Sequence, residues 1–195
     1  MVDSTSPRDW RKKLPMWITL SRIALVLPIL TLMNLETLTL RIAACLLFII
    51  ASITDYYDGY FARKYNAISN MGKFMDPVAD KILVSAILIM LVVHKWIDPY
   101  MVVLIITRDT LIGGLRSVAA ADQIVIDAKP AGKWKTALQM SAIPFLILGP
   151  DAWNNLSTPL PLHHWAYFAL WISTILSLTS GWEYYQGYLK ALNAK

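Results

Sequence analysis

Six long apolar runs occupy most of this chain and constrain its fold more than any other feature. Hydrophobic residues make up 56% of the sequence and charged residues 16%, a balance typical of a protein that crosses a bilayer several times. We therefore predict an all-α integral membrane protein with six transmembrane helices, in which residues 1–195 form a single domain. The predicted spans are 17–33, 38–54, 76–93, 99–120, 133–148 and 164–185. Several are shorter than the usual span of about 20 residues, so their helices should continue beyond the hydrocarbon.

The basic residues predict how the chain is oriented. Residues 1–16 form a basic juxtamembrane segment, which favours a short interfacial helix at an anionic leaflet before the first span. Six spans put both termini on one side, and nearly all lysines and arginines near the span ends share that side; only Arg41 and Lys95 face the other. The positive-inside rule assigns that side to the cytoplasm, which predicts a multi-pass protein of the inner, cytoplasmic membrane. The rule also accounts for the net charge of +5, so we expect no nucleic-acid partner.

Four aspartates gather at the ends of two of these runs, on what we predict to be the cytoplasmic side. In helical geometry the first segment places two acids and two small residues on one face, at Asp55, Asp58, Gly59 and Ala62. The second segment repeats the arrangement with Gly72, Asp76 and Asp80. Two such faces turned toward each other would line a cleft with carboxylates.

A divalent cation would make this acidic cluster stable. Carboxylates close together repel one another and raise each other's pKa, and a bound cation removes that repulsion. Oxygen ligands at this density suit Mg²⁺ or Mn²⁺, with Ca²⁺ as a competitor, rather than zinc. The alternative is that the acids cap helices, since Asp76 before Pro77 has the pattern of an N-cap followed by proline. Capping explains only one aspartate of the four.

The spacing of these residues resembles the signature of the CDP-alcohol phosphatidyltransferase family. The matching pattern is Asp55-x2-Asp58-Gly59-x2-Ala62-Arg63-x8-Gly72-x3-Asp76-x3-Asp80. The resemblance covers about residues 15–140, because 15–22 are similar to an N-terminal element of the family and 108–140 to the branch that uses sn-glycerol 3-phosphate. Met16 departs from this pattern, since that branch usually has Asn there. Family members are membrane enzymes with six helices and are commonly homodimers, so the resemblance implies a homodimer.

The resemblance also implies an activity and the residues that perform it. Members of the family displace CMP from a CDP-linked lipid by an alcohol, with two Mg²⁺ (or Mn²⁺) ions in each active site. Matching positions make Asp80 the general base for the alcohol. The implied metal ligands are Asp55, Asp58, Asp76 and Asp80. The implied contacts to the nucleotide of CDP-diacylglycerol are Thr19, Gly59, Ala62, Arg63 and Gly72. Gly59 and Ala62 leave room for the ribose or base, and helix packing is an equal alternative for Gly72.

A second group of residues is basic and predicts the acceptor. Arg108 interrupts an apolar run, where an unpaired cation is expensive, and Arg116 follows about 80° around the helix. Lys133 and Lys135 begin the next predicted helix. Our hypothesis is that these four bind the phosphate of the acceptor, sn-glycerol 3-phosphate in the resembling branch. The alternatives are neutralisation by Asp109 and contact with the surface formed by membrane lipids.

Two other functions remain open from the sequence. The same chemistry with serine, inositol phosphate or a second phospholipid as acceptor would explain the acidic segments equally well. A divalent-cation transporter would also carry acids in a membrane, but here all four lie at one boundary of the predicted spans.

Overall fold

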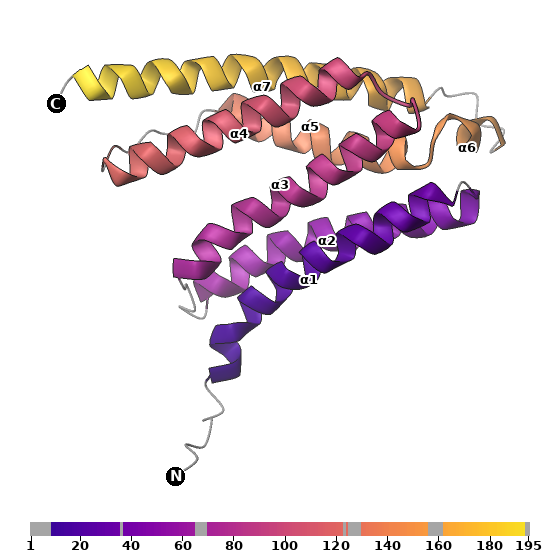
Figure 1. Cartoon of the computed structure of the whole chain (residues 1–195), viewed down its shortest axis with the longest axis horizontal. Coiled ribbons are helices and arrows are strands. Elements are labelled where there is room, and N and C mark those ends of the chain that lie inside the picture. The colour runs from indigo at the N-terminus through magenta and orange to yellow at the C-terminus, as the bar shows by residue number, and fades with distance from the viewer. Residues whose placement is uncertain are drawn as a thin grey trace, which may run out of the picture. The chain divides into compact units, whose positions relative to one another are not determined.

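The computed structural model describes the backbone over residues 9–35, 37–64, 70–122, 124, 130–155 and 162–193. Side chains are described over 20–35, 37–54, 78–122, 124, 132–152 and 162–193. Within these ranges every regular element is a helix, which confirms the all-α prediction (Figure 1). The helices are α1 (Asp9–Asn34), α2 (Leu38–Lys64), α3 (Asn70–Val93), α4 (Pro99–Ala121), α5 (Pro130–Ile147), α6 (Pro150–Asn155) and α7 (Leu162–Asn193).

Six of these helices cover the predicted apolar runs to within one residue, and several continue past them. Helix α2 runs on to Lys64 and α7 to Asn193, well beyond the ends of the runs at residues 54 and 185. Among the described residues, no helix combines the length and the apolar character that crossing a membrane requires.

Three details differ from the sequence prediction. Helix α1 runs unbroken from Asp9, so a separate short N-terminal helix is wrong; residues 9–16 are largely Arg, Lys, Leu and Met, which favour helix. Helix α3 begins at Asn70, so Asp76 lies inside it and is not its N-cap. The φ of a proline is itself helical, so Pro77 does not mark the start. Helix α6 was not predicted, because six residues are too few for a periodic pattern.

The chain forms two compact units, Met1–Met90 and Leu91–Lys195. In the first unit α1 and α2 pack along each other as a helical hairpin. Apolar side chains of both helices, among them Ile29, Met33 and Phe48, are almost completely buried. Ala44 and Ala51 are buried on α2, where small side chains allow helices to approach closely. Arg22 is also buried, with 2% of its surface exposed.

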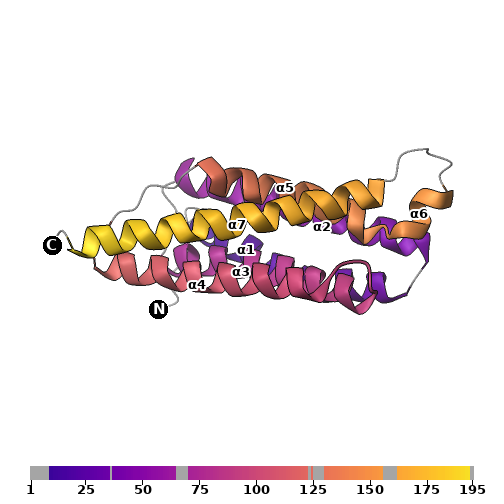
Figure 2. The same ribbon diagram turned by 90° about the horizontal axis from the view of Figure 1, so that it is seen from above.

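In the second unit α7 lies between α4 and α5 and packs against both (Figure 2). Its apolar core joins residues of the three helices, including Met101, Ile105, Ile143, Leu146 and Leu170. Asp98 caps α4 by accepting a hydrogen bond of 2.8 Å from the Tyr100 backbone N–H. Gly149, with φ 78°, makes the left-handed turn between α5 and α6.

The buried face of α7 changes character along the helix. Near its start it buries Ala166 and Leu170, and further on it buries small, mostly polar residues. These are Ser173, Thr174, Ser177, Ser180 and Gly181. Buried polar groups need hydrogen-bond partners; Thr174 bonds to the Leu170 carbonyl of its own helix, while Ser173, Ser180 and the Ser177 carbonyl bond to Lys135 and Arg108 of α5 and α4.

Candidate functional site

The backbone of the two acidic segments has the predicted helical geometry. Asp55 and Asp58 are three residues apart within α2, and Asp76 and Asp80 are four apart within α3. Positions at these spacings share one face of an α-helix. Of the residues predicted for the metal and the nucleotide, only the side chain of Asp80 is described. The others, Thr19, Asp55, Asp58, Gly59, Ala62, Arg63, Gly72 and Asp76, have side chains outside the described residues.

Asp80 is partly exposed on α3, next to Ala79, which is completely buried. Among the described side chains, no group of three or more His, Cys, Asp or Glu residues could hold a metal ion. The side chains of three of the four predicted ligands, Asp55, Asp58 and Asp76, lie outside the described residues. The metal site therefore stays a prediction, and the chemistry of the donors is its support: four carboxylates on helical backbone suit a hard, oxygen-seeking cation.

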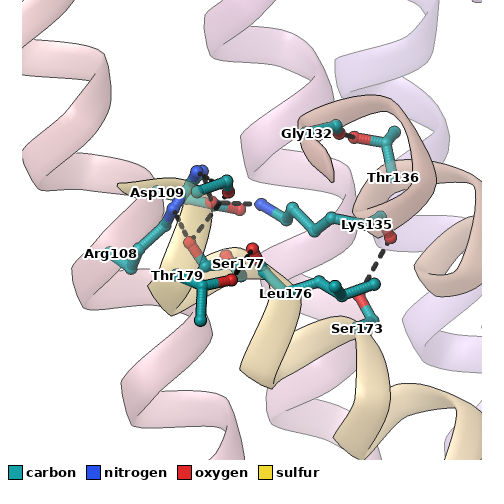
Figure 3. Close-up of polar contacts among 10 residues, drawn as sticks. Arg108, Asp109, Gly132, Lys135, Thr136, Ser173, Leu176, Ser177 and Thr179 are labelled. Carbon is teal, nitrogen blue, oxygen red and sulfur yellow. Dashed lines mark hydrogen bonds and ion pairs between the residues drawn. The ribbon is translucent and has the colours of Figure 1, made fainter. Parts of the chain in front are cut away.

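The structure brings Arg108 and Lys135 together on Asp109 (Figure 3). One guanidinium nitrogen of Arg108 lies 3.0 Å from Oδ1 of Asp109, and Nζ of Lys135 donates to the same oxygen. The side chains are 14%, 8% and 23% exposed for Arg108, Lys135 and Asp109. Each cation would be costly in such a place without an anion. Asp109 therefore neutralises part of the positive charge of Arg108 and Lys135, which we predicted to bind the acceptor phosphate.

Helix α7 completes the surroundings of this ion cluster. Arg108 donates from Nε to the Ser177 carbonyl at 2.7 Å and from Nη2 to Ser180 Oγ at 2.8 Å. Ser173 Oγ donates to the Lys135 carbonyl at 2.9 Å. At Gly181 an added Cβ would lie only 3.0 Å from Arg108 Nε. The small residues of α7 are therefore what lets the arginine reach the helix backbone.

The other two predicted cations, Arg116 and Lys133, are exposed. The guanidinium carbon of Arg116 lies over the ring of Tyr184, 5.4 Å from its centroid. One turn further along α7, Tyr188 donates to Asp122 Oδ2 at 3.1 Å. Partial burial, the hydrogen bond and the charge of Asp122 together raise the pKa of Tyr188, so its hydroxyl stays protonated and keeps donating.

The four basic residues thus form two pairs. Arg108 and Lys135 are largely buried and share one carboxylate. Arg116 and Lys133 are exposed, and an exposed arginine and lysine can bind a phosphate from solution. Burial and ion pairing therefore distinguish the two pairs.

The sequence prediction missed the contribution of α7, which lies beyond residues 15–140, where the resemblance was drawn. Its signal was present in the spacing of small residues, with Ser173, Ser177 and Gly181 recurring every four positions. That period places them on one face of a helix. Tyr184 has no comparable signal, because nothing in its local sequence indicates that it meets Arg116.

Comparison with known proteins shows the family to which this chain belongs. The family model for CDP-alcohol phosphatidyltransferase matches residues 12–179, which include both acidic segments and the basic residues of α4 and α5. The chain belongs to the CDP-alcohol phosphatidyltransferase family.

Three relatives are similar over nearly their whole length, and each is named CDP-diacylglycerol–glycerol-3-phosphate 3-phosphatidyltransferase. The relative from Bacillus subtilis strain 168 is 42% identical, covering 92% of this chain and 96% of its own length. That from Rickettsia bellii is 36% identical over 90% and 94%. That from Mycoplasma pneumoniae is 33% identical over 96% and 92%. The family resemblance drawn from the sequence is confirmed.

Proposed function

We propose that this protein transfers a phosphatidyl group from CDP-diacylglycerol to sn-glycerol 3-phosphate, which yields phosphatidylglycerophosphate and releases CMP. One observation carries the proposal: relatives whose name states this reaction are up to 42% identical over at least nine tenths of the chain. The acidic segments that define the family chemistry lie within the matched residues 12–179.

The acidic residues hold the metal ions in this proposal. Asp55, Asp58, Asp76 and Asp80 would bind two Mg²⁺ (or Mn²⁺) ions, and their all-oxygen character supports that choice. When bound, the cations would neutralise the pyrophosphate of CDP-diacylglycerol and the charge on the departing CMP.

Asp80 is also the general base. Its carboxylate accepts the proton of the acceptor hydroxyl, and the hydroxyl oxygen forms a bond to the phosphorus that carries the diacylglycerol. The bond from that phosphorus to the oxygen of CMP breaks, and its electrons leave with CMP. The partial exposure of Asp80 supports this role, because a base must be reachable by its substrate.

Residues of α1, α2 and α3 bind the nucleotide end of the lipid substrate. Arg63 contacts its phosphates, and Thr19 lies in the N-terminal element that the family associates with the nucleotide. Gly59, Ala62 and Gly72 admit the ribose and base, because any larger side chain at these positions would occupy the same space.

The basic residues bind the phosphate of glycerol 3-phosphate. Arg116 and Lys133 contact it directly, and their exposure supports this. Arg108 and Lys135 add positive charge nearby, and Asp109 fixes their positions. A neutral acceptor such as glycerol would have no use for this set of cations.

The reaction takes place at the inner membrane, with the protein as a multi-pass homodimer whose active site and termini face the cytoplasm. The acyl chains of CDP-diacylglycerol support a membrane location. Many large apolar side chains are exposed, for example Leu27 at 72%, Leu111 at 66% and Phe168 at 58%. Lipid tails or a second copy of the chain would cover such surfaces at little cost.

An assay of the purified protein in detergent tests the function. CMP release from CDP-diacylglycerol is measured with glycerol 3-phosphate, glycerol, serine and inositol phosphate in turn, with Mg²⁺, with Mn²⁺ and with a chelator. We expect release with glycerol 3-phosphate only, and only when a divalent cation is present. Release with serine instead would identify serine as the acceptor. No release with any alcohol, together with cation flux in proteoliposomes, would make the protein a transporter.

Replacing Arg116 by alanine should raise the KM for glycerol 3-phosphate by about tenfold or more. Losing a charge-assisted hydrogen bond to a phosphate costs roughly 1.5–3 kcal/mol, which corresponds to that change. The KM for CDP-diacylglycerol should stay the same. Steady-state CMP release at varied concentrations of each substrate measures both constants.

Lys190→Ala is the matched control, since Lys190 is an exposed cation near the end of α7. If Arg116 served only as contact to the membrane surface, both variants would change both constants alike. Equal rises in the two KM values of Arg116→Ala would contradict the assignment to the acceptor.

A further inference from the structure

The last turns of α7 lie along the end of α4, where Arg116 is located. Three contacts follow one another along the two helices in the same order, so α4 and α7 run parallel. Arg108 meets Ser177 and Ser180, Arg116 meets Tyr184, and Tyr188 meets Asp122. The second and third contacts lie at or beyond the end of the sixth apolar run, in a part of α7 for which no role was predicted.

The contact with Tyr184 restricts Arg116 without occupying its donors. An exposed arginine samples many rotamers, and it loses this conformational freedom when the side chain binds an anion. A guanidinium over an aromatic face is attracted through its charge to the ring. Its N–H groups stay available for a phosphate, which they can bind in pairs.

The contact one turn further on holds Tyr184 in place. Tyr188 follows Tyr184 by four residues, so the two share one face of α7. The hydrogen bond from Tyr188 to Asp122 at 3.1 Å joins this face to the C-terminal end of α4. Because Asp122 caps the C-terminal end of the helix that carries Arg116, the bond holds the two helices together next to the contact between Tyr184 and Arg116.

From these contacts we infer that Tyr184 is a positioning residue, which holds Arg116 ready to receive the phosphate of the acceptor. The inference rests on the proposed function. It assigns to α7 a part in selecting a phosphorylated alcohol, in addition to its packing in the second unit. Tyr184 itself does not touch the substrate; it acts through Arg116.

Replacement of the ring tests this. Tyr184→Leu should raise the KM for glycerol 3-phosphate roughly three- to fivefold, which corresponds to about 0.6–1 kcal/mol, the size of an exposed cation–π contact. The kcat and the KM for CDP-diacylglycerol should not change. Tyr184→Phe keeps the ring and should bring the acceptor KM back toward the wild-type value. Tyr185→Leu is the control, because Tyr185 is an exposed neighbour that pairs with Trp182 instead.

The same substitution is also made in the Arg116→Ala variant, to distinguish positioning of Arg116 from a general structural effect. In Arg116→Ala protein, Tyr184→Leu should leave the acceptor KM unchanged, since the residue through which it acts is gone. The same rise in both backgrounds, a rise in both KM values, or no rise at all would overturn the inference. Thermal unfolding is measured for every variant, and Tyr184→Met replaces Tyr184→Leu if the latter does not fold. Failure of the proposed function would appear separately, as wild-type protein that releases no CMP with glycerol 3-phosphate.

Discussion

Replacing Asp80 by asparagine is expected to lower kcat for CMP release by a factor of about 10²–10⁴, which is the usual contribution of a general base. Asparagine has nearly the same size and can still donate and accept hydrogen bonds, but it cannot take the proton from the acceptor hydroxyl. The CDP-lipid should still bind, because the remaining three aspartates and the small residues of α2 are unchanged. Turnover is measured by CMP release and binding by calorimetry with CDP-diacylglycerol in detergent.

Asp98→Asn is the matched control for this substitution. Asp98 caps α4, and asparagine caps helices as well as aspartate does, so this variant should keep its activity and its unfolding temperature. Activity of Asp80→Asn close to wild type would remove Asp80 as the base. A loss of lipid binding in the same variant would instead make Asp80 mainly a metal ligand.

Asp58→Asn separates those two roles further. A residue that only holds the metal should shift the Mg²⁺ concentration needed for half-maximal activity and recover part of its kcat at high Mg²⁺. A general base should recover nothing, because excess metal does not supply a proton acceptor. The two variants are therefore compared across a titration of Mg²⁺.

The helices could be predicted from the sequence because apolar runs are a local signal. Six runs gave six long helices, and the expectation that helix continues beyond the runs is met at Lys64 and Asn193. Helices α1 and α3 begin at Asp9 and Asn70, ahead of the apolar runs that start at residues 17 and 76, because charged and polar residues also form helix and leave no hydrophobic signal there. Capping residues and prolines indicate where a helix can begin, but the contacts of the folded chain determine which of these positions starts the helix.

The acidic segments could be predicted because their residues are close in sequence and have helical spacing. The basic residues show the limit of that reasoning. Arg108 meets Ser177 across 69 residues, and Lys135 meets Asp109 across 26. Neighbours in a helix do not normally face each other, so the sequence could offer Asp109 only as an alternative partner of Arg108, which the ion pair between them confirms. The pairing follows from the position of α7, which places both side chains in the same buried space.

Replacing Asp109 by alanine is expected to lower the unfolding free energy by about 2–3 kcal/mol. Breaking a buried ion pair by removing one partner costs about 3–5 kcal/mol, and the 23% exposure of the Asp109 side chain reduces this. For a chain of this length the loss corresponds to a fall of roughly 5–10 °C in Tm. The reason is that Arg108 and Lys135 would stay charged and close together without an anion. Thermal unfolding of the purified protein in detergent measures the change.

A second substitution shows whether charge is the cause. In Asp109→Ala/Lys135→Met one of the two uncompensated cations is gone, while Arg108 keeps its bonds to Ser177 and Ser180. The double variant should therefore unfold at a higher temperature than Asp109→Ala alone, although it has lost more side-chain atoms. Asp151→Ala, at an exposed aspartate, should change Tm little. If the double variant unfolds below the single one, Lys135 stabilises the unit by packing, and the shared carboxylate is not what holds α4 to α5.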